Sequence, residues 1–321
     1  MDKPVTGSRT LTASIVLCTR NRGDRLRSAL AAIAAMAVPD DVSWECLVVD
    51  NGSSDGTRDV AGEFVSRFPG VFCYTFEPRP GKTFALNRGL DEARGELLAF
   101  TDDDAIVQKD WLAAIVRAVK HHDADGVGGK VLPLWEVPPP GWLTPEFHNV
   151  LALLDLGDAP LRVACKTDPR MLYGVNFAFR RGVFDRLGKF NTILGSRGED
   201  QELFDRIISA GLRVFYDPSI VVSHMISRDR LDIDYYERWY RDTGASRALL
   251  VAAGSRQVLG IPLYVIRQAL ESFVKRLATG VGSDQAARLR ARFNWIYYRS
   301  FIRARLGTRL AATPQPARPG R

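Results

Sequence analysis

Three consecutive aspartates, Asp102, Asp103 and Asp104, follow directly on the apolar run 97–101. A short apolar run that ends in an acidic cluster is typical of a buried strand that opens into a solvent-facing loop. Hard carboxylate oxygens on such a loop favour Mg²⁺ or Mn²⁺, and these ions usually hold a substrate phosphate as well. The alternative is a solvated turn whose last aspartate caps a helix predicted to begin near Gln108. The cluster raises the hypothesis of a metal-dependent site, which the neighbouring loops must support.

The elements that position this cluster alternate between strands and helices. Apolar runs predict strands at 14–18, 44–49, 71–76 and 96–100, and amphipathic patterns predict helices at 24–36, 57–68, 83–94 and 108–121. Such alternation is typical of parallel strands joined by crossover helices. Ligands of open α/β sheets bind outside the carboxyl ends of the strands, so the loop after each strand is a candidate binding segment.

Polar loops follow all four predicted strands, at 19–22, 50–57, 79–83 and 102–104. Asp50 stands where the second strand ends, and a carboxylate there can accept hydrogen bonds from a base or a ribose. The alternative for 50–57 is a turn and helix cap, since Asn-Gly and Asp-Gly pairs are strong turn signals. The first strand is not followed by Gly-x-Gly-x-x-Gly, and no Walker-type loop occurs, which argues against those two nucleotide-binding classes.

Taken in order, five segments resemble motifs of family 2 glycosyltransferases, and the match spans roughly residues 12–225. The segments are Ser-Ile-Val-Leu-Cys-Thr-Arg-Asn-Arg (14–22), Val-Val-Asp-Asn-Gly-Ser-Ser-Asp-Gly-Thr (48–57), Gly-Lys-Thr-Phe-Ala-Leu-Asn-Arg-Gly-Leu (81–90), Phe-Thr-Asp-Asp-Asp-Ala (100–105) and Gly-Glu-Asp-Gln-Glu-Leu (198–203). The resemblance implies an α/β, Rossmann-like A-type glycosyltransferase fold with a mixed central sheet. It also implies an inverting enzyme that uses Mg²⁺ or Mn²⁺ and moves a sugar from a nucleoside-diphosphate sugar, with UDP favoured, to a hydroxyl of a saccharide or lipid-linked acceptor.

The same resemblance implies roles for individual side chains. Asp104 would ligate the metal on the diphosphate together with His224, and Asp200 would be the catalytic base with Glu199 as its orienter. Such a base would deprotonate the acceptor hydroxyl while the cation offsets charge on the leaving group. The residues assigned to nucleotide-sugar binding are Thr19, Asn21, Arg22, Asp50, Gly52, Lys82, Asn87, Asp102 and Asp103.

Four of the later residues also have a structural interpretation. Acidic side chains in a first helical turn, such as Glu199 and Asp200, complement the helix dipole without any catalytic role. A lone histidine at the end of an apolar run, such as His224, is often a hydrogen-bonded rim residue. Asn176 is a candidate contact to the donor sugar or, equally, a buried polar group within a strand.

Charge divides the chain into unequal parts. Residues 260–321 contain twelve Lys or Arg and two acidic residues, so they carry a formal charge of +10 and leave −3 for the remainder. We expect a catalytic domain at 1–230, a basic helical extension at 231–310 and a disordered tail at 311–321. Apolar and aromatic residues interleaved with Arg, including 261–269, 273–277 and 293–302, indicate interfacial helices on an anionic membrane surface. The alternative is helices that pack on the catalytic domain with a solvated basic face.

Composition narrows the remaining classes of protein. Fractions of 46% apolar and 25% charged residues are typical of a soluble globular protein, and four widely spaced cysteines predict neither a zinc site nor a disulfide framework. The polar N-terminus and the lack of a long apolar segment predict a protein that is cytoplasmic or peripheral on the membrane's cytoplasmic face. A nucleotidyltransferase, the alternative enzyme class, would usually need a glycine-rich basic loop after the first strand, and the loop 19–22 does not supply one. Nucleic-acid binding through the Arg-rich tail, which is the non-enzymatic alternative, would leave the four polar loops unexplained.

Overall fold

A computed structural model describes residues 12–194, 197–250, 256–279 and 284–312, with side chains described as far as residue 307. Its contacts divide the chain into two units. The first unit comprises the residues up to Glu136 together with Leu151–Ile226, and the second comprises Val137–Val150 together with the residues from Ser227 onward. The predicted boundary at residue 230 lies close to the end of the first unit. The sequence did not indicate that 137–150 belong with the C-terminal part.

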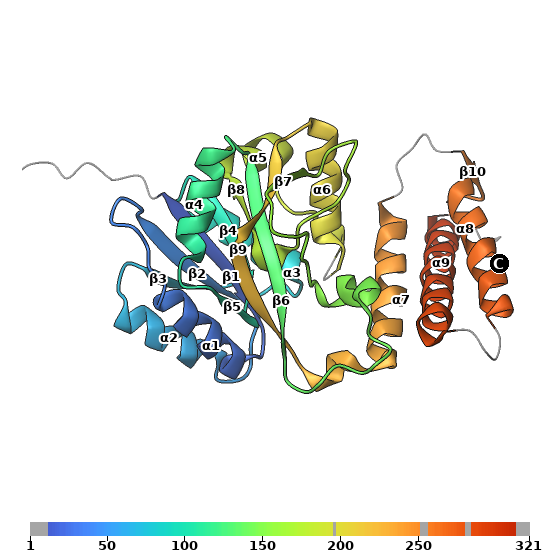
Figure 1. Ribbon diagram of the computed structural model, residues 1–321, viewed down its shortest axis with the longest axis horizontal. Coiled ribbons are helices and arrows are strands. Elements are labelled where there is room, and N and C mark those ends of the chain that lie inside the picture. Colours follow the sequence, from blue (N-terminus) through green and yellow to red (C-terminus); the bar gives the residue numbers. More distant parts are fainter. Residues whose placement is uncertain (1–11, 195–196, 251–255, 280–283, 313–321) are drawn as a thin grey trace, which may run out of the picture. The chain divides into compact units, whose positions relative to one another are not determined.

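The first unit is built on one sheet, to which nine strands of the described residues contribute (Figure 1). The strands are β1 (Ala13–Thr19), β2 (Trp44–Asp50), β3 (Phe72–Phe76), β4 (Leu97–Asp102), β5 (Ala105–Val107), β6 (Gly126–Trp135), β7 (Leu161–Val163), β8 (Phe177–Arg180) and β9 (Val214–Ile226). Their order is β3-β2-β1-β4-β8-β6-β9-β5, with β7 also paired to β9. Strands β1 to β4 are parallel, whereas β8 is antiparallel to both β4 and β6. The predicted mixed sheet is confirmed.

Helices connect the parallel strands as the sequence pattern predicted. The helices of this unit are α1 (Gly23–Ala34), α2 (Thr57–Arg67), α3 (Lys82–Glu92), α4 (Trp111–His121), α5 (Arg181–Leu187) and α6 (Glu199–Ala210), with short 3-10 turns η2 (Gly174–Asn176) and η3 (Thr192–Leu194). The predicted apolar face of α1, Leu26, Leu30 and Ile33, is buried. Since β1–α1–β2–α2–β3–α3–β4 follow one another in this way, the polar loops fall at the carboxyl ends of the strands.

One hydrophobic core joins the central strands to α3, α5 and α6. The ring of Phe177 in β8 lies 5.3 Å from that of Phe100 in β4 and 6.2 Å from that of Phe204 in α6. Aromatic contacts of this kind add to the burial of apolar area. The packing fixes α3 and α6, whose first residues are Lys82 and Glu199, against the same region of the sheet.

Strand register places the candidate residues at one edge of the sheet. Thr19 at the end of β1 is paired with Asp50 at the end of β2, and Cys18 is paired with Asp102 at the end of β4. Since these three strands are parallel, their following loops leave the sheet side by side. The predicted gathering of polar loops therefore has a direct structural basis.

The second unit is helical. It contains η1 (Pro145–Leu151, up to Val150), η4 (Arg228–Leu231), α7 (Ile233–Leu249), α8 (Leu263–Ala278), α9 (Gln285–Ala312) and a small hairpin of β10 (Gln257–Val258) and β11 (Ile261–Pro262). Helices α7 and α9 approach closely at Gly244, where a Cβ atom would lie 2.3 Å from the carbonyl oxygen of Tyr297. The predicted C-terminal helices are thus present. Residues 313–321 of the predicted tail lie outside the described residues.

None of the described helices has the length and apolar character that crossing a bilayer requires.

Candidate active site

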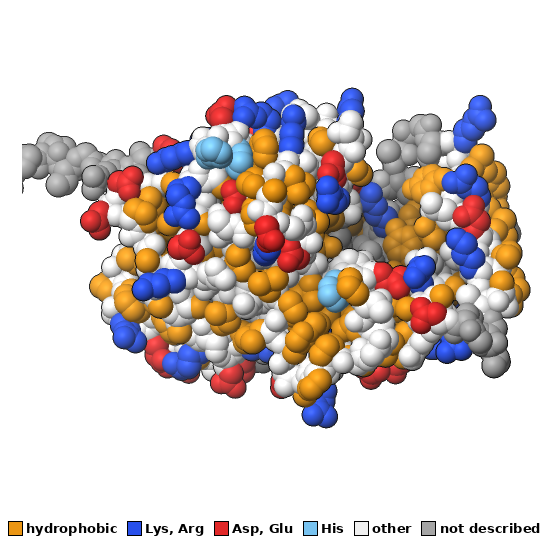
Figure 2. Space-filling view, viewed as in Figure 1, with side chains coloured by type: hydrophobic (Ala, Val, Ile, Leu, Met, Phe, Trp, Pro, Cys, Tyr) orange, Lys and Arg blue, Asp and Glu red, His pale blue; other side chains and the backbone are white. Residues whose placement is uncertain are grey.

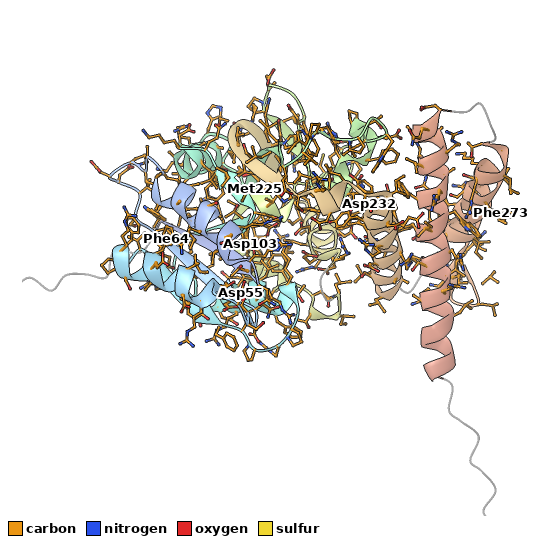
Figure 3. All side chains as sticks on the ribbon, turned by 90° about the horizontal axis from the view of Figure 1, so that it is seen from below. Asp55, Phe64, Asp103, Met225, Asp232 and Phe273 are labelled. Atoms are coloured by element: carbon orange, nitrogen blue, oxygen red, sulfur yellow. The ribbon has the colours of Figure 1, made fainter. Side chains whose placement is uncertain are left out.

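The loops after β1 and β4 are joined by a buried acidic cluster. Thr19 Oγ1 donates a hydrogen bond of 2.8 Å to Asp103 Oδ2. Arg22 Nη1 donates to Asp103 Oδ1 at 2.9 Å and to Asp104 Oδ2 at 3.2 Å. Both aspartates are at most 3% exposed. Figure 3 labels Asp103 within this group, in the first unit.

The electrostatics of the cluster are those of a buried carboxylate pair with a cationic partner. Burial raises the pKa of Asp103 to about 6; Arg22 opposes this shift and the charge of Asp104 adds to it. Burial alone would lower the pKa of Arg22, but the charges of Asp103 and Asp104 raise it overall. Arg22 therefore remains a cation and compensates charge that could not otherwise be buried.

Arg25 is a second cation at this cluster and was not predicted from the sequence. Its Nη1 atom lies 3.7 Å from Asp104 Oδ2. Arg25 follows Arg22 by three residues at the start of α1, and side chains with this spacing share a helix face. The three-residue spacing from Arg22 could have indicated Arg25 from the sequence alone.

Asp104 also contacts His224 across strands β5 and β9. The register pairs Ala105 with His224, and this places His224 Nε2 3.0 Å from Asp104 Oδ1. The other ring nitrogen, Nδ1, lies 2.9 Å from the carbonyl oxygen of Leu151, which can only accept a hydrogen bond. Nδ1 therefore donates to Leu151, and Nε2 and Asp104 Oδ1 face each other in an arrangement suited to a cation held between them.

This donor set fits a divalent metal ion. A metal-ligating histidine usually donates its other N–H to a backbone carbonyl, as His224 does to Leu151. Among the residues that the structure describes, no group of three or more His, Cys, Asp or Glu is arranged as a complete metal site. Mg²⁺-type sites commonly take one or two protein ligands and complete their coordination with substrate phosphates and water. Asp104 and His224 could act in this way.

The alternative interpretation of the three aspartates as a solvated turn is wrong. Asp104 is 2% exposed, and helix α4 begins at Trp111 with Asp110 at its N-cap position. Asp104 therefore caps no helix.

Lys82 connects a second group of candidate residues. Its Nζ atom lies 3.3 Å from Asp102 Oδ1 and 3.3 Å from Glu199 Oε1. Burial alone would lower the pKa of Lys82, but the charges of Asp102, Glu199 and Asp200 raise it well above its usual value. A cation shared by β4 and α6 holds the end of the acidic loop next to the first turn of α6.

Asp200 is held by a backbone donor outside its own helix. The N–H group of Gly174, in η2, donates to Asp200 Oδ2 at 2.9 Å. Burial raises the pKa of Asp200 to about 7; the charge of Glu199 adds to this shift, whereas Lys82 and the Gly174 hydrogen bond oppose it. A carboxylate with a pKa near neutrality can act as a general base.

Gly174 is a positioning residue that the sequence did not reveal, and its replacement gives a first prediction. A Cβ atom at Gly174 would lie 2.8 Å from Asp200 Oδ1, so Gly174→Ala must displace the carboxylate. We expect kcat to fall about 10- to 100-fold while the donor Kd stays unchanged, because small displacements of a base are costly. The comparison is Gly182→Ala in α5, where a Cβ atom meets nothing within 4 Å. Equal kcat values for the two variants would contradict this role.

Asp50 is buried and accepts hydrogen bonds from its own loop and from strand β3. Its Oδ1 accepts from the N–H of Ser53 at 2.8 Å, and its Oδ2 accepts from the hydroxyl of Tyr74 at 2.9 Å. Burial, aided by this hydrogen bond and by the charge of Asp50, raises the pKa of Tyr74 to about 12, so Tyr74 stays protonated. Contact between Asp50 and a nucleoside remains a prediction.

Asn51 is another residue that the sequence analysis left unassigned. Its Nδ2 donates to the carbonyl oxygens of Glu77 and Arg79 at 3.1 and 2.7 Å, and its Oδ1 accepts from Gly81 at 2.8 Å. These bonds tie the end of β2 to the loop that leads into Lys82. Asn51 therefore positions the lysine without facing a ligand itself.

Asn21 and Gly52 form turns. Asn21 has φ of 52° and accepts at Oδ1 from the N–H of Ser54 at 2.7 Å, and Gly52 has φ of 76°. Asp55, labelled in Figure 3, accepts from the N–H of Thr57 at 3.1 Å at the start of α2. The turn part of the alternative is thus confirmed for 50–57, whereas the N-cap residue of α2 is Gly56, which makes no side-chain cap hydrogen bond. The binding roles of Asn21 and Gly52 remain predictions.

Two asparagines are used inside the protein. Asn87 exchanges two hydrogen bonds of 2.9 Å with the backbone of Phe190, so it holds the segment before α6, and its predicted binding role remains untested. Asn176 accepts from Trp111 Nε1 and donates to the carbonyls of Lys130 and Ile220. Asn176 is 1% exposed, so of its two predicted roles, contact to the donor sugar or a buried polar group, the structure shows the buried polar group.

Comparison with known proteins identifies the family. Residues 14–188 match the model of glycosyl transferase family 2, which is more than half of the chain. The chain belongs to this family and is a glycosyltransferase that uses a nucleotide sugar.

Two curated relatives extend the match beyond the family model. The succinoglycan biosynthesis protein ExoM of Rhizobium meliloti (strain 1021) is 28% identical over 260 residues, covering 79% of this chain and 81% of that protein. The glucosyl-dolichyl phosphate glucuronosyltransferase of Haloferax volcanii is 25% identical over 230 residues, covering 69% and 72%.

A solved structure confirms the A-type fold. The mannosyltransferase PcManGT from Pyrobaculum calidifontis, in complex with GDP-Man and Mn²⁺, superposes with a TM-score of 0.62 at 21% identity. The superposition covers 96% of this chain and 89% of that one, so it includes the C-terminal helices.

Proposed function

We propose that this chain is an inverting, metal-assisted transferase with Asp200 as general base. It moves a sugar from a nucleoside-diphosphate sugar to a hydroxyl group of a saccharide or lipid-linked acceptor. The observation that carries the proposal is the Lys82 ammonium group, which contacts both Asp102 of the acidic loop and Glu199 beside Asp200. These contacts support a single site that contains both the donor-binding loops and the base.

Asp104 and His224 are the proposed ligands of Mn²⁺ or Mg²⁺. When bound there, the cation supplies Lewis-acid stabilisation of the diphosphate leaving group. The Mn²⁺ and GDP-Man bound to PcManGT support a Mn²⁺ site and keep GDP-sugars beside UDP-sugars as candidate donors. The surrounding residues would bind the donor itself: Thr19, Asn21, Arg22, Asp50, Gly52, Lys82, Asn87, Asp102 and Asp103.

The chemistry of the base follows from its hydrogen bonding. The Gly174 N–H holds Asp200 Oδ2, so Oδ1 is the oxygen available to accept the proton of the acceptor hydroxyl. As that proton leaves, the hydroxyl oxygen attacks the anomeric carbon and the nucleoside diphosphate departs from the opposite face. This single displacement needs one base and no covalent sugar–enzyme bond. Glu199 orients the site through Lys82.

The names of the relatives support the acceptor class. ExoM is named for biosynthesis of succinoglycan, a polysaccharide, and the Haloferax enzyme is named for a lipid-linked sugar acceptor. The nucleotidyltransferase and nucleic-acid-binding alternatives gain no support from these comparisons.

The pKa of Asp200 gives a pH prediction. Only the ionised carboxylate accepts a proton, so kcat should rise with pH, with a midpoint near 7, and fall tenfold per unit well below it. The cationic Lys82 lowers the pKa of Asp200, so Lys82→Met should move the midpoint to higher pH. The exposed Lys120 of α4 provides the control Lys120→Met. A midpoint that does not move in Lys82→Met, or that moves to lower pH, would exclude this assignment.

Titration calorimetry of the full chain with UDP-, GDP- and dTDP-sugars, each in Mn²⁺ and in EDTA, tests the proposed function. We expect one nucleotide class to bind in Mn²⁺ and to lose most of its affinity in EDTA. If no nucleotide sugar binds with Mn²⁺ or Mg²⁺, the proposal fails.

A further inference from the structure

Helix α8 of the second unit carries an exposed apolar stripe. Its members, between 41% and 69% exposed, are Leu263, Leu270, Phe273, Val274 and Leu277. Their spacing places them on one side of the helix, and the sixteen residues of α8 give that side a length of about 24 Å. The opposite side, with Val265, Ala269 and Ser272, is buried. Phe273 is labelled on α8 in Figure 3.

The hairpin before α8 adds to this apolar surface. Val258 and Leu259 are 51% and 64% exposed, and Leu259 and Gly260 have φ of 51° and 76° in the tight turn. With Tyr264, which is 54% exposed, eight large hydrophobic side chains are thus exposed between 258 and 277. Isolated exposed apolar residues are ordinary, but a continuous group of this size usually marks a binding surface. Figure 2 shows hydrophobic side chains with Lys and Arg beside them where Figure 1 places α8.

Charges beside the stripe indicate the kind of partner. Residues 256–279 contain four basic residues, Arg256, Arg267, Lys275 and Arg276, and one acidic residue, Glu271, so they carry a net charge of +3. Arg267 Nε lies 3.6 Å from Glu271 Oε1. A shallow depression on this surface is lined by Arg267, Leu270, Glu271, Val274 and Lys275. A second copy of the chain would bring two such basic faces together, and like charges oppose that contact. An anionic bilayer offers both hydrocarbon and negative headgroups.

The phenylalanines of α9 do not form part of this surface, whereas the ring of Trp295 lies 5.1 Å from that of Phe273 in the stripe. Residues 293–302 are among the segments predicted to be interfacial, but Phe293 and Phe301 are at most 1% exposed. The ring of Phe293 lies 5.6 Å from that of Phe147 and 5.1 Å from that of Tyr240. These residues are core of the second unit, so the prediction of an interfacial role for this stretch is wrong for its phenylalanines.

We propose that the α8 face, defined as the five residues of the apolar stripe with Arg267 and Lys275, binds the surface of an anionic phospholipid bilayer. The helix lies parallel to the bilayer, with the stripe in the boundary between headgroups and acyl chains and the cations among the headgroup phosphates. The inference does not depend on the donor or base assignments. Such attachment would bring the enzyme to the surface where lipid-linked acceptors reside.

Vesicle co-sedimentation of the full chain tests this surface. Wild-type protein should bind vesicles that contain phosphatidylglycerol, bind phosphatidylcholine vesicles much less, and dissociate at high salt. Replacing Leu270, Val274 and Leu277 together with glutamine should lower partitioning at least about tenfold. Arg267→Glu with Lys275→Glu should lower it at least about 25-fold, because each cation near an anionic surface contributes about fivefold.

Matched variants and a folding check complete the experiment. Leu134→Gln, at a residue that is 50% exposed on β6, and Arg117→Glu with Lys120→Glu, an exposed pair on α4, should bind vesicles as wild type does. All variants should keep the wild-type unfolding temperature and nucleotide-sugar affinity, which separates this test from that of the proposed function. Failure of wild type to bind anionic vesicles, or a dimer that dissociates in the glutamine variant, would overturn the proposal.

Discussion

Replacing Asp200 with asparagine should lower kcat about a thousandfold, because general-base catalysis typically contributes about 10²- to 10⁴-fold. The amide cannot take the acceptor proton, although it preserves the shape of the side chain and can still accept the hydrogen bond from Gly174. The donor Kd should stay within about twofold of wild type, because the base acts on the acceptor. Transfer or donor hydrolysis at saturating nucleotide sugar, paired with calorimetry, measures both quantities.

Asp205→Asn is the matched control for this result. Asp205 lies further along α6 and accepts a hydrogen bond from Gln201 within the helix. The Asp205→Asn variant should retain wild-type kcat. If Asp200→Asn keeps kcat within about tenfold of wild type, a different side chain is the base, because the loss then falls below the usual range.

Replacing Asp104 with asparagine should weaken donor binding in Mn²⁺ at least about 100-fold, because loss of a direct ligand should exceed the 10–100-fold typical of outer-shell partners. The remaining affinity should no longer depend on whether Mn²⁺ or EDTA is present. The fold should survive, because Arg22 keeps its contact of 2.9 Å with Asp103. Calorimetry with the donor and electron paramagnetic resonance titration of Mn²⁺ measure the two losses separately.

Two further variants sharpen this prediction. His224→Gln should weaken Mn²⁺ binding in the same direction, because it removes the imidazole that faces Asp104 at 3.0 Å. Asp110→Asn, at the half-exposed N-cap position of α4, should change neither metal nor donor affinity. Unchanged, Mn²⁺-dependent donor binding in Asp104→Asn would remove the metal assignment.

Much of the first unit could be predicted from local pattern. Apolar runs and helical periodicity depend on neighbours in sequence, and the end of β4 was predicted two residues short, at Phe100 instead of Asp102. The order of the polar loops was also accessible, because parallel strands must end at one edge. The motif resemblance supplied Asp200 and His224, which no local periodicity connects to Asp104.

Contacts between distant segments could not be predicted. Gly174 carries no signal of its own, and only the packing of η2 against α6 brings its N–H to Asp200. The bonds of Asn51 depend on the path of the loop 77–81. Arg22 was assigned to the donor, whereas the structure shows it paired with two buried aspartates.

In the second unit, too, the packing between helices could not be predicted from the sequence. Helices α8 and α9 both combine apolar residues with arginines, so composition did not distinguish them. The two helices differ in how their apolar residues are packed. Phe293 of α9 is enclosed by rings from η1 and α7, whereas the apolar stripe of α8 lies on the side of that helix away from its buried residues.

The anomeric configuration of the sugar first released by donor hydrolysis tests the central claim most directly. Proton NMR would follow an α-linked nucleotide sugar in Mn²⁺, at enzyme concentrations where release is faster than mutarotation. A single displacement with Asp200 activating water in place of the acceptor predicts the β-sugar first, and Asp200→Asn should abolish its release. Initial appearance of the α-sugar would contradict the account, because it requires either a second displacement or attack from the other face.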